Sequence, residues 1–296
     1  MPEGKIVKSI AGFYEVYSGG EVYRCRARGV FRQLGEKPLV GDDVVFDITD
    51  TVSVPMEGNV VSIMKRKSVL QRPNVSNVDQ ALLLFAVKFP DPSLNMLDRF
   101  LISVSLRGLP VILCFNKCDL AEEEEIAALR RIYSGCGSDL LFISTRQEDS
   151  LKELKSTLAG KTTVLAGPSG AGKSSLIRTI CPGAMPETGE LSARIGRGRN
   201  TTRATQIYAV SSDTFLMDTP GFTSLYLQGV AADGLKEYYP EFDGYAPDCR
   251  FDTCMHYREP DCAVKAAVRE GRIPVERYQN YIDLYAELKD RRPVYD

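Results

Sequence analysis

Gly167-Pro168-Ser169-Gly170-Ala171-Gly172-Lys173-Ser174 is the stretch of this 296-residue sequence that decides the fold class. It matches the phosphate-binding P-loop pattern at every required position, between a buried-strand pattern at Thr163–Ala166 and a helix pattern that begins near Lys173. The glycines allow backbone N–H groups to curl around phosphate oxygens, and the helix N-terminus contributes its positive dipole end. A chance glycine-rich turn is the alternative, and the strand–loop–helix context disfavours it.

Two side chains of this loop have expected chemical roles. Lys173 is expected to neutralise the β- and γ-phosphates of a nucleotide, and the hydroxyl of Ser174 is expected to bind Mg²⁺. The predicted nucleotide contacts of the loop are Gly167, Pro168, Ser169, Gly170, Ala171, Gly172, Lys173, Ser174 and Ser175.

A second motif, Asn116-Lys117-Cys118-Asp119, indicates which base is bound. The carboxylate of Asp119 can accept both N–H donors on the guanine edge, whereas adenine presents an acceptor there. The first two residues of the motif are expected to brace the base and the loop. Ser144 and Thr145, which end the next strand pattern, are expected to support the guanine O6 atom. The sequence therefore predicts a GTP site and disfavours an ATP-dependent kinase or RNA-processing enzyme.

Two further segments complete the predicted phosphate site. Asp218, at the end of the strand pattern Thr214–Met217, is expected to hold Mg²⁺ through water, and the N–H of Gly221 is expected to sense the γ-phosphate. Thr201 or Thr202, in a basic segment, is expected to complete the Mg²⁺ shell. A solvated basic loop is the alternative for that segment.

These motifs occur in a permuted order. In the usual GTPase the P-loop comes first and the guanine motif comes late, whereas here the guanine motif precedes the P-loop by about fifty residues. The strands can still form the same sheet, but the ends of the domain have moved. The chain now leaves from the predicted γ-phosphate sensor into the C-terminal region, so we expect the nucleotide state to be linked to that region.

Three domains are expected, over residues 1–66, 67–226 and 227–296. In the first, short strand patterns predict a small closed barrel, either an OB-fold or an SH3-like barrel, at Gly12–Tyr17, Glu21–Arg28, Leu39–Ile48 and Asn59–Met64. In the second, strands alternate with helices, which predicts an α/β domain with a mostly parallel sheet. The third is irregular and ends in a predicted helix at Val275–Lys289.

A cluster of metal-binding residue types lies in the third domain. Cys249, Cys254, His256 and Cys262 follow one another within fourteen positions and include the only histidine of the chain. Three thiols and one imidazole form a common closed tetrahedral zinc set, so we expect one structural Zn²⁺. Four unrelated residues are the alternative. We expect the remaining cysteines to be core or surface thiols without disulfides.

Composition limits the cellular setting. The net charge is −2, so contact with nucleic acid requires local patches rather than a global basic field. No apolar run is long enough for a bilayer and Met1–Ser9 lacks a secretory core, so we expect a cytoplasmic protein without membrane contact. We also expect it to be a monomer.

Two groups of side chains are candidates for contact with RNA. Arg24, Arg26 and Arg28 alternate along one predicted strand and therefore share a face, which is either an RNA-binding face or a solvated edge. Tyr278, Tyr281 and Tyr285 in the last helix are predicted to pack it down rather than to stack on bases.

The permuted motifs, the N-terminal barrel and the cysteine–histidine tail together resemble the small-subunit-dependent ribosome-assembly GTPases, the RsgA or YjeQ family. The resemblance covers essentially the whole chain and includes Gly29–Arg32, Val40–Asp42, Asn77–Gln80, Leu97–Phe100 and Asp218–Phe222. It implies an OB-fold, a circularly permuted GTPase domain and a zinc domain. It also implies slow GTP hydrolysis stimulated by the small (30S) ribosomal subunit, late maturation of that subunit, contact with its rRNA and release of other assembly factors.

The sequence departs from the family pattern at one position and from many GTPases at another. Asn200 stands where the family usually has a histidine before the two threonines, and an amide cannot act as a base near neutral pH. Phe222 stands where many GTPases have a glutamine that orients water. A GTP-dependent rRNA-binding switch, in which hydrolysis is incidental, is therefore the alternative function.

Overall fold

Short strands with alternating inward side chains form the N-terminal barrel. This computed structural model describes residues 1–29, 31, 35–71, 73–181, 183–184, 205–218, 227 and 229–291. The barrel strands are β1 (Glu3–Ile10), β2 (Phe13–Ser18), β3 (Glu21–Ala27), β4 (Asp43–Asp50) and β5 (Met56–Ile63). They pair in the order β1-β2-β3-β5-β4, and β1 also pairs with β4, which closes the barrel. The OB-fold prediction is confirmed.

The barrel differs from the prediction in two places. The predicted strand Leu39–Ile48 begins only at Asp43, because the preceding residues form a turn in which the N–H of Leu39 donates to Asp42 (2.7 Å). The strand β1 was not among the predicted strands. Its alternation is masked because Lys5, Ile6 and Val7 are all buried, between the barrel interior and the next domain.

A mostly parallel sheet forms the middle of the molecule. Its strands are β8 (Gln80–Ala86), β9 (Val111–Asn116), β10 (Asp139–Phe142), β11 (Thr162–Ala166), β12 (Gln206–Ala209) and β13 (Phe215–Asp218). They are ordered β10-β9-β8-β11-β13-β12, and only the β12–β13 pairing within this set is antiparallel. A two-stranded hairpin, β6 (Val69–Gln71) and β7 (Asn74–Ser76), connects the barrel to this sheet.

Helices cover both faces of the sheet. The helices are α2 (Leu94–Ser105), α3 (Glu123–Tyr133), α4 (Leu151–Leu158) and α5 (Lys173–Ile180). Side chains of α2 and α3 share a core with Leu83 and Phe85 of β8, whereas those of α4 and α5 share a core with Leu82 and Leu84. Every residue of β8 is buried, as expected for a central parallel strand.

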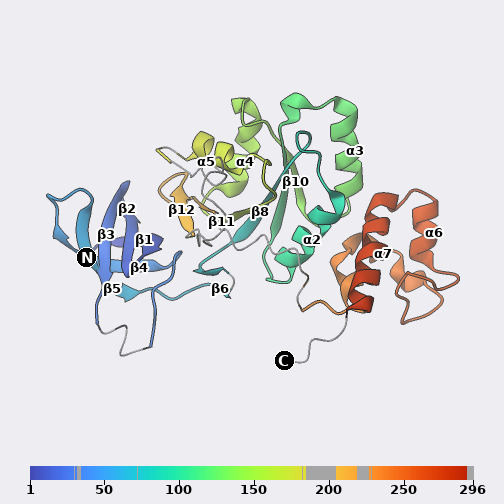
Figure 1. Cartoon of the computed structure of the whole chain (residues 1–296), viewed down its shortest axis with the longest axis horizontal. Helices are drawn as coiled ribbons and strands as arrows, with labels where there is room; N and C mark the ends of the chain where they lie inside the picture. Colours follow the sequence, from blue (N-terminus) through green and yellow to red (C-terminus); the bar gives the residue numbers. More distant parts are fainter. Residues whose placement is uncertain are drawn as a thin grey trace, which may run out of the picture.

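The C-terminal part packs against the end of the sheet domain that lies away from the barrel (Figure 1). It contains α6 (Ala263–Arg269), α7 (Val275–Asp290) and the short 3₁₀ helices Leu235–Tyr238, Pro240–Phe242 and Ala246–Asp248. Tyr281 and Tyr285 are buried in its core, and Tyr278 packs against that core. The prediction that these rings pack the last helix is confirmed.

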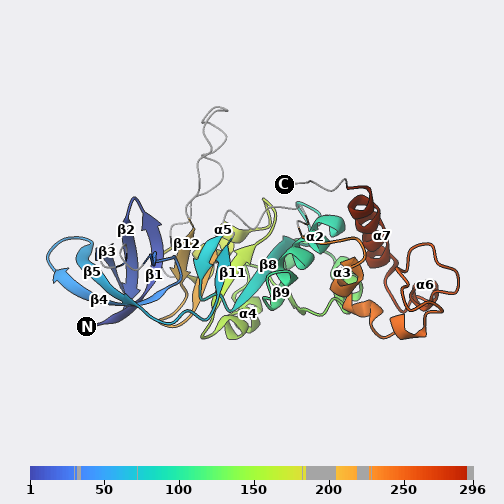
Figure 2. The same ribbon diagram turned by 90° about the horizontal axis from the view of Figure 1, so that it is seen from below.

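The three parts follow one another in a line in both views (Figures 1 and 2). The barrel and the sheet domain are continuous, because β1 pairs with β12 and so extends the sheet into the barrel. Within the described residues, no helix is both long and apolar enough to cross a bilayer.

Candidate nucleotide and metal sites

The carboxyl ends of parallel strands bring the predicted motifs to one edge of the sheet. The guanine motif begins at Asn116, the last residue of β9, the P-loop follows β11, and Asp218 ends β13. Asp218 pairs with Leu165 across β13 and β11, which places it beside the entry to the P-loop. Ligands of open α/β sheets bind at this edge. The permuted order along the chain therefore does not separate the motifs in space.

The P-loop requires glycine at both of its ends. Gly167 has a φ of +143°, and a Cβ there would lie 2.0 Å from the carbonyl oxygen of Leu84. Gly172 has a φ of +100°, and a Cβ there would lie 2.3 Å from Nδ2 of Asn116. A side chain at either position would displace the loop, so the backbone can curl only with these residues.

Lys173 lies over the loop at the first turn of α5. Its Nζ donates to the carbonyl oxygens of Gly167 and Pro168, each at 2.7 Å. Ser174 and Ser175 follow in the same helical turn and are half-buried. The ammonium group is therefore placed at the mouth of the loop, where phosphate oxygens can replace the two carbonyls as its partners.

Asn116 connects the two halves of the predicted site. Its Nδ2 donates to the carbonyl oxygen of Ala171 (3.0 Å), and its Oδ1 accepts from the N–H of Thr145 (3.2 Å). The side chain is 1% exposed. One buried amide thus fixes the P-loop relative to the loop after β10, so its predicted role as a brace has a direct structural counterpart.

Asp119 is oriented by two neighbours. Ser144 was expected to contact the base instead, and Arg146 was not predicted as a site residue. The hydroxyl of Ser144 donates to its Oδ1 (2.6 Å), and Arg146 Nη1 lies 3.6 Å from its Oδ2. Ser144 was expected to support guanine O6, but its hydroxyl and its N–H, and the N–H of Thr145, all have protein partners. The O6 contact therefore stays a prediction, whereas Ser144 gains a role in orienting Asp119.

Cys118 lies within the same motif as a protonated thiol. Burial raises its pKa to about 11, and the negative charge of Asp119 adds to the shift. The thiol therefore stays neutral at physiological pH and does not compete with Asp119 for a charged role.

A loop that sequence reasoning missed supports both motifs. Lys117 Nζ donates to the carbonyl oxygen of Phe89, and Pro90 lies against Gly170, with its Cδ 3.1 Å from where a Cβ of Gly170 would be. Lys88 forms an ion pair with Glu125 of α3 (2.9 Å). The sequence signal was only a short proline-containing stretch after β8, which has no motif of its own.

Several predicted residues lie outside the described part of the chain. These are Thr201 and Thr202, the predicted Mg²⁺ ligands, Gly221, the predicted γ-phosphate sensor, and the two departures Asn200 and Phe222. Their assignments stay predictions.

The four metal-binding residue types come together in the C-terminal part. The candidate ligand atoms of Cys249, Cys254, His256 and Cys262 all lie within 4.8 Å of one another. His256 Nδ1 is 3.6 Å from the Sγ of Cys249 and 3.5 Å from that of Cys262, and these two sulfurs are 3.8 Å apart. All the other cysteines are free thiols, and all but Cys118 are buried. The group can hold a metal ion.

Tyrosines of α7 fix the backbone of this group. The hydroxyl of Tyr278 donates to the carbonyl oxygen of His256 (2.7 Å), and that of Tyr281 donates to the carbonyl oxygen of Met255 (2.5 Å). The ring of Phe242 contacts the imidazole of His256 edge-on, with centroids 5.7 Å apart. The ligand loop is therefore attached to the helix that docks this part of the chain.

Arg24 and Arg26 of β3 and Arg28, one residue beyond the end of that strand, are all exposed, but they are not equivalent. The guanidinium carbons of Arg24 and Arg26 lie 4.0 and 4.8 Å from the centre of the Phe13 ring. Arg28 instead forms an ion pair with Asp47. Two stacked cations and one ring thus form a surface cluster, the Phe13 platform, while the charge of the third arginine is compensated within the barrel.

Comparison with known proteins agrees with the motif order and the fold. The family model RsgA GTPase matches residues 63–228, and the model RsgA N-terminal domain matches residues 3–53. The small ribosomal subunit biogenesis GTPase RsgA of Agathobacter rectalis is 45% identical over 98% of this chain and 99% of its own. The protein of that name from Geobacillus thermodenitrificans is 41% identical over 100% of both chains.

Solved structures show the same likeness. YjeQ from Thermotoga maritima superimposes with a TM-score of 0.76 at 33% identity, over 98% of this chain and 99% of that one. YloQ, a circularly permuted GTPase, superimposes with a TM-score of 0.73 at 36% identity, over 100% of this chain and 97% of that one. On sequence and fold together, the chain belongs to the RsgA GTPase family.

Proposed function

We propose that this protein is a GTP hydrolase that acts in biogenesis of the small ribosomal subunit. The observation that carries the proposal is the joining of the P-loop, Asn116 and Asp119 at one sheet edge in permuted order, in a member of the RsgA GTPase family. The relatives compared above are named small ribosomal subunit biogenesis GTPases. The proposed domains are residues 1–66, 67–226 and 227–296, and the proposed setting is a cytoplasmic monomer.

The site can bind GTP with Mg²⁺ through residues at the carboxyl edge of the sheet. Lys173 neutralises the β- and γ-phosphates, Ser174 binds Mg²⁺, and Asp218 holds the ion through water. Thr201 or Thr202 completes the metal shell and Gly221 senses the γ-phosphate. Since Asn200 cannot act as a base and Phe222 cannot orient water, intrinsic turnover is slow, at or below about 10⁻³ s⁻¹.

Base selection is tested at Asp119. Because its carboxylate accepts two N–H donors, the protein should prefer guanine to adenine nucleotides by about 10⁴-fold. Asp119→Asn should weaken GTP binding and favour xanthosine nucleotide, whose edge offers an oxygen in place of the amine. Asp139→Asn, at an exposed residue that begins β10, is the matched control. Equal affinity of the unmodified protein for ATP and GTP would contradict the assignment.

The metal group is proposed to hold one structural Zn²⁺. Ligands arranged tetrahedrally at about 2.3 Å (sulfur) and about 2.0 Å (nitrogen) lie about 3.8 Å apart for two sulfurs and about 3.5 Å apart for sulfur and nitrogen. The separations of 3.8, 3.6 and 3.5 Å among Cys249, His256 and Cys262 match these values. Four protein ligands leave no open position, so the ion has no part in catalysis.

Contact with rRNA is proposed at the Phe13 platform. A ring flanked by guanidinium groups offers stacking to an unpaired base and charge to its phosphates. The double variant Arg24→Ala/Arg26→Ala should weaken binding of small subunits. The slope of log affinity against log salt concentration should also become shallower by about two. Arg28→Ala is the matched control, because Asp47 already compensates that cation. An unchanged salt slope in the double variant would remove the platform from the rRNA interface.

Stimulation by the subunit separates the proposed function from its alternative. Single-turnover GTP hydrolysis is measured with and without purified small subunits. A rise on addition of subunits supports an assembly enzyme whose hydrolysis triggers its own release and that of other assembly factors. Nucleotide-dependent subunit binding without such a rise supports the rRNA-binding switch. Rapid hydrolysis by the free protein, indifferent to subunits, contradicts both.

A further inference from the structure

The barrel is joined to the GTPase sheet at two places, and the first leads to Asp218. Lys8 of the barrel strand β1 pairs with Gln206, the first residue of β12. Gln206 pairs in turn with Asp218, the last residue of β13. The three residues therefore lie side by side across three adjacent strands, and only β12 stands between the barrel and the proposed Mg²⁺ site.

The other end of β13 also touches the barrel. The buried ring of Phe215 contacts Tyr17 edge-on, with centroids 5.8 Å apart. Lys5 Nζ lies 5.4 Å from the centre of the same ring. The strand that presents Asp218 is thus in contact with the barrel at its first residue and, through Gln206, at its last. A movement of the barrel relative to the sheet must either move β13 or break these contacts.

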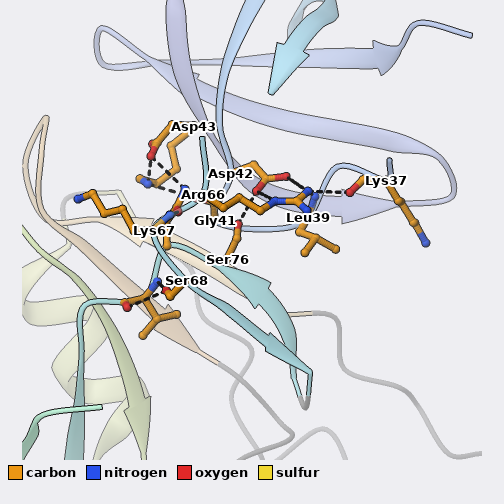
Figure 3. A network of polar contacts seen from close by, with 12 residues as sticks. Lys37, Leu39, Gly41, Asp42, Asp43, Arg66, Lys67, Ser68 and Ser76 are labelled. Carbon is orange, nitrogen blue, oxygen red and sulfur yellow. Dashed lines mark hydrogen bonds and ion pairs between the residues drawn. The ribbon is translucent and has the colours of Figure 1, made fainter. Parts of the chain in front are cut away.

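The second junction is a buried polar network, the Asp42 joint (Figure 3). The carboxylate of Asp42 is fully buried and accepts from Arg66 Nε (2.7 Å), Arg66 Nη2 (2.8 Å), Ser76 Oγ (2.6 Å) and the N–H of Leu39 (2.7 Å). Figure 3 shows Arg66 reaching from Asp42 to the carbonyl oxygen of Lys37. Arg66 and Ser76 belong to the segment that leads from the barrel to β8, so the joint fixes that segment to the barrel.

Close approach of the backbone makes this joint specific to one geometry. Gly41 has a φ of +99°, and a Cβ there would lie 2.1 Å from the carbonyl oxygen of Ser76. The amide of Asn77 donates to the carbonyl oxygen of Gly41 and to Oδ2 of Asp43, each at 3.1 Å. Rotation of the barrel here would leave buried polar groups unpaired, which is unfavourable for each group. The Asp42 joint is therefore the fixed point between the two domains.

From these two junctions we infer that the barrel is a lever that sets the position of the Asp218 carboxylate. A macromolecule that binds the barrel exerts a force on it. Because the barrel is held at the Asp42 joint, that force acts on β12 and β13. Asp218 then moves relative to the P-loop, which would change how well its carboxylate could hold Mg²⁺ there. The inference rests on the proposed function, because it takes the small ribosomal subunit as what grips the barrel.

Neutral variants of the joint test the lever in the full-length protein. Asp42→Asn keeps the side-chain shape and removes the charge, and Arg66→Gln removes the charge together with the guanidinium group. Stimulation of GTP hydrolysis by saturating purified small subunits should fall about 5- to 150-fold, the range of ordinary coupling between sites. Basal turnover, GTP affinity and co-sedimentation with subunits should stay as in the unmodified protein. Asp47→Asn, the same substitution at the ion pair inside the barrel, should keep full stimulation.

The outcomes separate the lever from the proposed function. Full stimulation of both joint variants overturns the lever and leaves the proposed function standing, whereas no stimulation of the unmodified protein removes both. Equal loss in Asp47→Asn also overturns the lever, because the effect is then general damage to the barrel. Should the joint variants fail to fold, Tyr17→Ala removes the contact with Phe215 without touching a charge. Reduced stimulation in that variant supports the lever, and full stimulation overturns it.

Discussion

At each end of the GTPase domain, the junction with the neighbouring domain contains a fully buried aspartate bound to an arginine. At the barrel, Asp42 binds Arg66, whose side chain is 22% exposed. At the C-terminal part, Asp98 of α2 binds Arg277 of α7, whose side chain is 2% exposed. The two ion pairs are of the same type, but the pair at the barrel is partly hydrated and the pair at the C-terminal part is dry. Loss of the arginine should therefore have different consequences at the two ends of the domain.

The Asp98–Arg277 pair, which we call the dry joint, also includes a second carboxylate. Arg277 Nε donates to Glu241 (2.6 Å), so one guanidinium serves two carboxylates. The amide of Asn280 (2.8 Å) and the hydroxyl of Tyr239 (3.3 Å) donate to Asp98 as well. Burial raises the pKa of Asp98, and the Arg277 guanidinium acts in the opposite direction. Without Arg277, two acidic groups would remain in a site from which water is excluded.

Of the changes that test the difference between the two joints, removal of the metal should have the largest effect. Tyr278 and Tyr281 tie the ligand loop to the helix that carries Arg277, so the dry joint depends on a folded loop. Binding of Zn²⁺ to Cys/His sites in zinc-finger peptides is worth about 10 kcal/mol or more, so Cys262→Ser should unfold the C-terminal part locally. Metal analysis should find one zinc per chain in the unmodified protein. GDP affinity should change little, because the P-loop lies in another domain.

One result of the metal analysis would contradict the zinc assignment. Protein purified without added metal that contains almost no zinc, while its C-terminal amides stay protected from hydrogen exchange, would falsify it. Cys136→Ser, at a buried thiol outside the metal group, controls for the loss of a cysteine in general.

The next largest effect is expected for Arg277→Ala. Removing one partner of a buried pair typically costs about 3–5 kcal/mol, and here two carboxylates lose their cation. The free energy of unfolding from urea titration measures the loss. A loss of unfolding free energy smaller than the contribution of an exposed ion pair would show that the dry joint adds little to stability.

The same variant should respond to pH in a defined direction. Without Arg277 the remaining influence of burial raises the pKa of Asp98 further above that of the unfolded chain. The folded state then binds a proton that the unfolded state releases, so stability falls as pH rises through the folded pKa and recovers on acidification from neutrality. Urea midpoints measured from neutral to mildly acidic pH should therefore rise for Arg277→Ala relative to the unmodified protein. A parallel pH dependence of the two proteins would contradict this.

Arg66→Ala should cost less, about 1–3 kcal/mol. Ser76 and the N–H of Leu39 still donate to Asp42, and water can reach the place of the partly exposed guanidinium. The urea midpoint relative to Arg277→Ala gives the contrast between the two joints. Equal losses would mean that hydration does not distinguish them.

The smallest effect is expected for Arg131→Ala. Arg131 pairs with Glu276 at the same C-terminal interface, but the side chains are 58% and 30% exposed. Exposed pairs contribute about 0.2–1 kcal/mol, and the contribution should disappear in high salt. A loss comparable to that of Arg277→Ala would show that position at the interface, rather than burial, sets the energy.

Sequence reasoning succeeded where a pattern and its chemistry lie within one short stretch. The strand, loop and helix around Gly167–Ser174 appear where they were expected, and so does the cluster of the four Cys and His residues. It failed for β1, because Lys5, Ile6 and Val7 are all buried, on both faces of that strand, and so show no alternation of buried and exposed residues. It also gave Ser144 a partner on the base, whereas the folded chain places its hydroxyl on Asp119.

The sequence by itself determined the kind of nucleotide, the permuted order of the motifs and the metal group, because each depends on residue types at fixed spacing. Only the tertiary structure decided which distant residues meet. Arg277 and Asp98 are 179 positions apart, and Lys8 reaches Asp218 only through Gln206 of an intervening strand. Such contacts leave no local pattern, because their energy comes from the burial and hydrogen bonding that appear once separate segments have packed together.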